Sequence, residues 1–215
     1  MTGAKTPALF IDRDGTLVEA RHYPSRPEDL VLYPGIGPGL RLLQGAGWKL
    51  VVITNQSGIA RGLFTEDDLG RMHDHLRAEL AAQGVTIDAI FHCPHHPEGT
   101  VADLAISCGC RKPRPGMLLA AANQLGIDLA ASWMLGDILD DIEAGTRAGC
   151  RTVLVDIGTE SPPTFPNRRP TAVARDTAHA LAIVAAAAGL GPAPDRYLPS
   201  RWSVAIPTLE AAHAG

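Results

Sequence analysis

Two aspartates that follow a short apolar segment are the residues in this sequence best suited to catalysis. Apolar residues run from Ala8 to Ile11, and Asp12 and Asp14 come directly after them, before a glycine at position 15. Two carboxylates this close repel each other, and burying them is costly unless a cation lies between them. Magnesium is such a cation, because it prefers hard oxygen ligands. The pair therefore predicts a carboxylate nucleophile at Asp12 that attacks phosphorus, with Asp14 as the general acid and base.

The same Asp-x-Asp-Gly pattern also occurs in calcium-binding loops, and it can form a plain turn with two solvated aspartates. The glutamate that a calcium loop needs at its spacing is absent after Asp14. The apolar residues before Asp12 form a strand that would direct both acids into a site. The phosphoryl-transfer interpretation is therefore favoured over a calcium loop and over a solvated turn.

A third aspartate has the same relation to an apolar segment much later in the chain. Asp137 closes the segment Trp133–Leu135 and is the expected third carboxylate at magnesium. Asp141 follows Asp137 closely in the sequence, and its expected role is to orient either Lys112 or a metal-bound water. Asp140 is interpreted only as a residue that begins a helix.

Polar side chains able to hold a phosphorylated substrate follow a second apolar segment and also form a basic loop. The first group is Thr54, Asn55, Gln56 and Ser57, and hydroxyls there can hold a phosphoryl oxygen. In the loop, Lys112 can neutralise the phosphate as a point charge, while Arg111 can bind a second anionic group with two hydrogen bonds. Each group alone is equally typical of an ordinary turn or an exposed basic loop, so the prediction depends on their lying together.

Soft metal donors form two tight pairs on either side of a loop: Cys93, His95, Cys108 and Cys110. Three thiolates and one imidazole suit tetrahedral zinc, and four protein ligands close the site, so the zinc is expected to be structural. His96 is an alternative to His95, because the spacing does not distinguish them. Cys150 is expected to be a small core residue, and a reducing compartment argues against disulfides.

The elements that must position these groups alternate between strand-like and helix-like segments. This alternation predicts an α/β, three-layer Rossmann-like fold with a mostly parallel sheet. Ligands of such sheets bind beyond the carboxyl ends of the strands. Three polar clusters are expected at those ends: Asp12–Thr16, Thr54–Gly58 and Gly136–Asp141. The expected strands are Ala8–Asp12, Lys49–Thr54, Ile87–His92, Trp133–Leu135 and Thr152–Val155, and the expected helices are Pro38–Gly47, Thr65–Gln83, Gly116–Leu125 and Asp140–Ala148, with an edge strand and a helix within Val173–Leu190.

Composition limits the possible partners and the location of the protein. The 215 residues carry a formal net charge of −4 and no basic stripe, which argues against a nucleic-acid partner. No apolar run is long enough to span a bilayer, and the N-terminus has no signal-peptide core, so we expect a cytoplasmic protein. Residues 1–190 are predicted to form one domain, with a zinc loop at 93–110. Residues 191–215 form a proline-rich tail of unknown role.

Taken together, the motifs resemble the haloacid dehalogenase superfamily of phosphatases, and within it the branch of heptose bisphosphate phosphatases and histidinol-phosphatases. The blocks that carry the resemblance lie between Ala8 and Val155, and they are Ile11–Thr16, Thr54–Gly62, Cys93–Pro97, Cys108–Pro113, Pro115–Leu118 and Gly136–Asp137.

The resemblance implies a role for each of these groups. Asp12 would be the nucleophile and Asp14 the general acid and base. Magnesium would be held by Asp12, the Asp14 carbonyl and Asp137. A small phosphorylated sugar is the implied substrate, in a monomer that lacks a large cap domain. Two regions depart from the family: Ile138 stands where the heptose enzymes carry lysine, and Leu17–Tyr23 matches only loosely.

Overall fold

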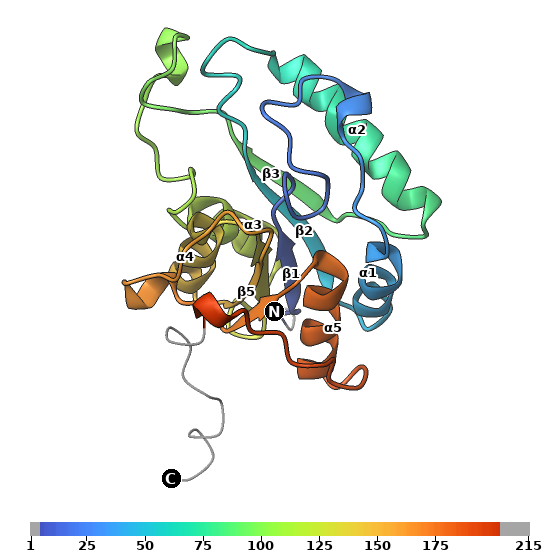
Figure 1. The fold of residues 1–215 in the computed structure, drawn as a ribbon. Coiled ribbons are helices and arrows are strands. Elements are labelled where there is room, and N and C mark those ends of the chain that lie inside the picture. The colour runs from blue at the N-terminus through green and yellow to red at the C-terminus, as the bar shows by residue number, and fades with distance from the viewer. Residues whose placement is uncertain (1–4, 203–215) are drawn as a thin grey trace.

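A six-stranded, entirely parallel sheet forms the centre of the computed structural model, which describes residues 5–202 (Figure 1). The strand order is β3-β2-β1-β4-β5-β6, so the chain starts in the middle of the sheet and builds outward in both directions. The strands are β1 (Ala8–Ile11), β2 (Lys49–Asn55), β3 (Ala89–Cys93), β4 (Trp133–Gly136), β5 (Arg151–Val155) and β6 (Ala172–Ala174). The predicted α/β fold with a parallel sheet is confirmed.

Helices cover both faces of the sheet and give the molecule three layers (Figure 1). On one face, β1 contributes Leu9 and Ile11 to a core shared with α1 (Ile36–Gly45), α2 (Glu66–Ala82) and α5 (Thr177–Ala187). On the other face, Ala8 and Phe10 pack against α3 (Gly116–Leu125) and α4 (Leu139–Ala148). Alternate residues of one strand thus enter two different cores, which explains why the strands are continuously apolar. Within residues 5–202, no helix is long and apolar enough to cross a membrane.

The helix boundaries agree with the expected ones to within about two residues, and their ends have clear physical causes. Thr65 caps α2 as predicted: its hydroxyl accepts the Asp68 N–H at 3.1 Å, and the Asp68 carboxylate accepts the Thr65 N–H at 2.8 Å. The first helix, α1, begins at Ile36 and not at Pro38. Proline is tolerated in the first helical turn, where its missing N–H has no partner to lose.

The last described segment of the chain packs against the outer part of the sheet. Trp202 is completely buried with Leu154 of β5 and Val173 of β6. The segment is also tied by charge, because Arg175 forms an ion pair with Asp195 and Arg201 forms one with Asp156. Of the predicted tail 191–215, residues 191–202 therefore dock on the domain, and residues 203–215 lie outside the described part.

Candidate active site

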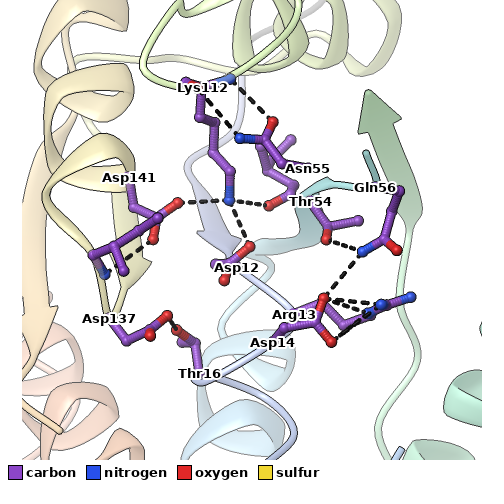
Figure 2. Close-up of polar contacts among 12 residues, drawn as sticks. Asp12, Arg13, Asp14, Thr16, Thr54, Asn55, Gln56, Lys112, Asp137 and Asp141 are labelled. Carbon is purple, nitrogen blue, oxygen red and sulfur yellow. Dashed lines mark hydrogen bonds and ion pairs between the residues drawn. The ribbon is translucent and has the colours of Figure 1, made fainter. Parts of the chain in front are cut away.

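Three aspartates gather at the carboxyl edge of the sheet because they follow neighbouring parallel strands or begin the next helix. Asp12 follows β1, and its N–H donates to the Leu135 carbonyl of β4 at 2.9 Å. Asp137 follows β4 directly, and Asp141 lies in the first turn of α4. Carboxylate oxygens of Asp12, Asp137 and Asp141 lie within 4.8 Å of one another, and all three residues are buried (Figure 2).

Two glycines allow this close approach. Gly15 has a φ of +85°, and a Cβ there would overlap the Asp137 carboxylate. A Cβ on Gly136 would overlap the Asp141 side chain in the same way. Glycine is thus needed at position 15 both for the left-handed backbone and for the space, because any other residue would displace a carboxylate.

Lys112 occupies the space between the acids. Its Nζ lies 2.5 Å from Asp12 Oδ1 and 2.5 Å from Asp141 Oδ1, and it donates to the Ile53 carbonyl at 3.0 Å (Figure 2). The Asn55 side chain holds the Lys112 backbone from β2, accepting its N–H at 3.1 Å and donating to its carbonyl at 3.2 Å. Lys112 and Asn55, both predicted from the sequence as substrate contacts, are therefore brought to the acids.

The charges in this cluster do not balance. Burial and the neighbouring carboxylates raise the pKa of Asp12 well above its ordinary value, and Lys112 only partly opposes them. Burial and Asp141 raise the pKa of Asp137 to about 7. One ammonium facing three buried carboxylates leaves excess negative charge, which a divalent cation with a preference for oxygen would neutralise. The donor set therefore fits magnesium.

Asp14 lies on the other side of Asp12 from Asp137 and borders a pocket of about 270 Å³ (Figure 2). Its carboxylate accepts hydrogen bonds from Arg13 and, at 3.0 Å, from Gln56 Nε2. The same Gln56 amide donates to Thr54 Oγ1 at 2.7 Å. The pocket is lined by Asp14, by the polar residues after β2 and by an earlier loop: Arg21, His22, Tyr23, Pro24, Asn55, Gln56, Ser57 and Gly58.

Some of the predicted substrate residues line this pocket, and others do not. Asn55, Gln56 and Ser57 line the pocket beside Asp14, while Thr54 is buried behind Gln56. Arg111 lies in the loop after Cys110, and its guanidinium donates to the His95 carbonyl at 3.5 Å. Sequence reasoning did not identify Arg13, whose side chain is fully buried, nor the loop residues Arg21 and His22.

The four predicted zinc ligands also lie together. The Sγ atom of Cys110 lies 3.2 Å from that of Cys93 and 3.1 Å from that of Cys108, and His95 Nδ1 lies 3.4 Å from Cys110 Sγ. All four donor atoms lie within 4.8 Å of one another, as a metal site requires. His96 turns instead toward Arg61, at 3.3 Å.

The protonation of these thiols is perturbed by their crowding. Burial acts to raise the pKa of Cys108, but hydrogen bonds from Cys110 and the Arg111 N–H outweigh it and lower the pKa to about 6. The low pKa favours the thiolate at Cys108, which is the form that binds a metal, whereas burial raises the pKa of Cys93 and of Cys110. The loop thus presents three sulfurs and one imidazole nitrogen as a candidate metal site, immediately before Arg111 and Lys112.

Comparison with known proteins gives consistent matches over most of the chain. A family model described as HAD-hydrolase-like matches residues 109–180. The D-glycero-beta-D-manno-heptose-1,7-bisphosphate 7-phosphatase of Yersinia pestis is 46% identical over 153 residues, which are 71% of this chain and 81% of that protein. The enzyme of the same name from Escherichia coli strain K12 is 44% identical over 162 residues, covering 75% and 85% of the two chains.

A solved structure agrees with these sequence matches. The D,D-heptose 1,7-bisphosphate phosphatase of B. bronchiseptica, complexed with magnesium and phosphate, superposes with a TM-score of 0.73 at 34% identity, over 86% of this chain and 100% of that one. The predicted resemblance to haloacid dehalogenase phosphatases is confirmed. The chain belongs to the D-glycero-beta-D-manno-heptose-1,7-bisphosphate 7-phosphatase family of HAD-like hydrolases.

Proposed function

We propose that this protein removes the 7-phosphate of D-glycero-β-D-manno-heptose 1,7-bisphosphate through an aspartyl-phosphate intermediate. The proposal rests on one observation: Asp12 lies at a strand end beside Lys112 and two further carboxylates, with Asp14 two residues away at a polar pocket. Relatives that are 46% and 44% identical carry the name of this activity.

In the first step, a carboxylate oxygen of Asp12 attacks phosphorus and the bond between phosphorus and the C7 oxygen breaks. Asp14 gives its proton to the departing oxygen, which leaves as the sugar hydroxyl. In the second step, Asp14 takes a proton from water as that water attacks the same phosphorus. The bond between phosphorus and Asp12 then breaks, inorganic phosphate leaves, and both aspartates return to their starting forms.

Magnesium would be held by Asp12, Asp137 and the backbone carbonyl of Asp14, while Asp141 keeps Lys112 in place. When bound, the ion supplies positive charge that offsets the phosphate dianion and the buried carboxylates. Thr16 supports this arrangement, because its hydroxyl donates to Asp137 Oδ1 at 3.2 Å and fixes that carboxylate. Lys112 carries the remaining positive charge beside the nucleophile.

The other predicted residues contact the substrate or shape the loop over it. Asn55, Gln56 and Ser57 bind the phosphorylated end of the sugar, with Thr54 supporting them, and Arg111 binds the second phosphate. A structural zinc at Cys93, His95, Cys108 and Cys110 holds the segment that presents Arg111. A monomeric, cytoplasmic protein remains a prediction.

A substrate comparison tests this function. Purified protein is assayed for phosphate release from the α and β anomers of heptose 1,7-bisphosphate and from histidinol phosphate, with and without magnesium. We expect the β anomer to give the highest kcat/KM, and activity to require magnesium. Faster turnover of histidinol phosphate would overturn the proposed substrate while leaving the mechanism intact. Ile138 makes the anomer comparison informative, since the related heptose enzymes are expected to carry lysine there.

A variant tests the mechanism itself. Replacing Asp14 by Asn keeps the shape of the side chain but removes the transferable proton. Because it also removes the carboxylate partner of the buried Arg13, activity is compared per folded protein. We expect kcat/KM for the heptose bisphosphate to fall by about 100- to 10,000-fold, as is typical when a general acid is lost. An Asp14→Asn variant with unchanged activity would exclude Asp14 as the proton donor.

A further inference from the structure

The residue between the two catalytic aspartates is a fully buried arginine. Arg13 has no solvent-exposed side-chain surface, and its guanidinium extends toward α2, where Nη1 lies 3.5 Å from His73 Nε2. Its Nε and Nη2 atoms donate to both oxygens of Asp14, at N···O distances from 2.9 to 3.2 Å (Figure 2). Asp14 is its only carboxylate partner within ion-pair distance in the part of the chain that is described.

The ion pair has one end in the protein interior and the other at the pocket. The Asp14 side chain is 24% exposed, whereas that of Arg13 is 0% exposed. Gln56 holds the same carboxylate from the pocket side and is fixed in turn by Thr54. The Asp14 carboxylate therefore accepts hydrogen bonds from the buried Arg13 guanidinium on its interior side and from the buried Gln56 amide on its pocket side.

The energetics make this arrangement restrictive. A buried guanidinium that loses its carboxylate partner is strongly destabilising, because its charge is then left uncompensated in the protein interior. His73 cannot replace Asp14 as the counter-charge, because an imidazole is either neutral or positively charged; burial and Arg13 lower its pKa to about 3 and keep it neutral. If the Asp14 side chain rotated away from the pocket, the Arg13 guanidinium would be left buried without a counter-charge. The buried cation therefore limits the positions that Asp14 can adopt.

We infer that Arg13 is a positioning residue that acts through Asp14 to place the proton donor at the leaving oxygen. The inference rests on the proposed role of Asp14 as general acid. It predicts that the benefit of Arg13 depends on how much the leaving group needs a proton. A sugar alkoxide needs one as it departs, whereas p-nitrophenolate is a stable anion and leaves without one.

The experiment compares two substrates across a set of variants. Arg13→Met, Arg13→Lys, Asp14→Asn and the double variant Arg13→Met/Asp14→Asn are assayed in magnesium with heptose 1,7-bisphosphate and with p-nitrophenyl phosphate. The parameter is kcat/KM, because it covers only the steps up to departure of the leaving group. Arg41→Met is the matched control, since Arg41 is exposed and, among residues 5–202, its side chain donates only to the Gln83 carbonyl.

We expect Arg13→Met to lower kcat/KM by about 10- to 100-fold for the sugar bisphosphate, as misplacement of a catalytic group does, and by less than about threefold for p-nitrophenyl phosphate. The double variant should be no slower than Asp14→Asn alone, because Arg13 acts through Asp14. Arg41→Met should leave both substrates unaffected.

Equal losses on both substrates would overturn the inference and assign Arg13 a purely structural role. If Arg13→Met does not fold, the Arg13→Lys variant distinguishes the positioning role from the structural one. It keeps the buried positive charge but has one nitrogen in place of the two that donate to Asp14, so the same substrate-dependent loss is expected. If Asp14→Asn itself slows both substrates equally, the general-acid role fails, and with it the proposed mechanism. A leaving-group effect in Asp14→Asn without one in the Arg13 variants refutes the inference alone.

Discussion

The two candidate metal sites of this protein are built in opposite ways. Asp12 and Asp137 are fixed by neighbouring strands of the sheet, and Lys112 and Thr16 hold their oxygens before any ion is bound. In the Cys–His site, Cys93 ends β3, but the other three donors lie in the long segment between β3 and α3, whose only regular structure is a short 3-10 turn at Ala102–Leu104. The first site is therefore preorganised by the fold, whereas we expect the second to depend on a bound metal for its order.

The two sites meet at one point in the chain. Cys110 is the last of the soft donors, and Lys112 comes two residues later, inside the carboxylate cluster. We therefore expect a change at Cys108 or Cys110 to affect the nucleophile through Arg111 and Lys112. The difference between the sites can be tested by damaging each one separately and recording both activity and metal content.

The largest effect is expected from removing the nucleophile. Asp12→Asn should lower phosphate release by about 10,000-fold or more, as loss of a nucleophile typically does. Zinc content per chain should not change, because the loop ligands are untouched. Stopped phosphate-release assays and metal analysis of the purified variant check both outcomes, and full activity in this variant would exclude the aspartyl-phosphate mechanism.

A subtler change tests how tightly the sheet places the carboxylates. Gly15→Ala would push against Asp137, and we expect kcat/KM to fall on the order of 100-fold. Gly126→Ala is the matched control, because Gly126 also has a positive φ, of +67°, but has no atom within 4 Å of the added methyl. Both variants should lose about 1 kcal/mol of unfolding free energy, measured in urea. Similar activities in the two variants would contradict the proposed crowding at Asp137.

Damage to the Cys–His loop should have a smaller effect on catalysis. Cys108→Ser/Cys110→Ser should abolish zinc binding, increase protease cleavage within residues 93–110, and lower kcat/KM by roughly tenfold through misplacement of Arg111 and Lys112. Cys150→Ala is the control, because Cys150 is a buried cysteine that is not one of the four candidate ligands. A loop that resists protease as well as the parent protein would show that zinc is not needed to order it.

The smallest expected effect is on the pH dependence of stability, and it concerns the buried His73, which contacts Arg13. The folded-state pKa of His73 is lowered to about 3, below its ordinary value near 6.5, so neutral His73 contributes stability above pH 6.5. That contribution is lost as the pH falls toward 3, by about 1.5 kcal/mol between pH 6.5 and pH 5. Urea unfolding at several pH values should show this slope, and His73→Gln should flatten it. The variant His75→Gln, on the same helix but less buried, is the matched control.

Much of the fold and of the site follows from local sequence patterns. Buried strands leave continuous apolar runs, and the acids that end them, Asp12 and Asp137, must meet because the strands are parallel neighbours. The capping pair at Thr65 is equally local. The four donors of the Cys–His loop also lie close in sequence, which is why their spacing alone indicated a metal site.

What could not be predicted depends on contacts between distant residues. The sequence pattern assigned no role to Arg13, since nothing nearby indicates that α2 would bury it against His73. Gln56 was interpreted as a substrate contact, but its amide also fixes Asp14 and Thr54. The burial of Trp202 against β5 and β6 needs the completed sheet, so the sequence pattern of the tail carried no signal for it.

That docked segment has a consequence for self-association. β6 is only three residues long and forms one edge of the sheet, where unpaired backbone groups would invite strand addition by another molecule. Residues 193–198 line a cavity together with Ala172 and Val173 of this strand. We therefore expect the C-terminal segment to shield that edge, and a protein shortened before residue 193 to show more aggregation by light scattering than the 215-residue chain.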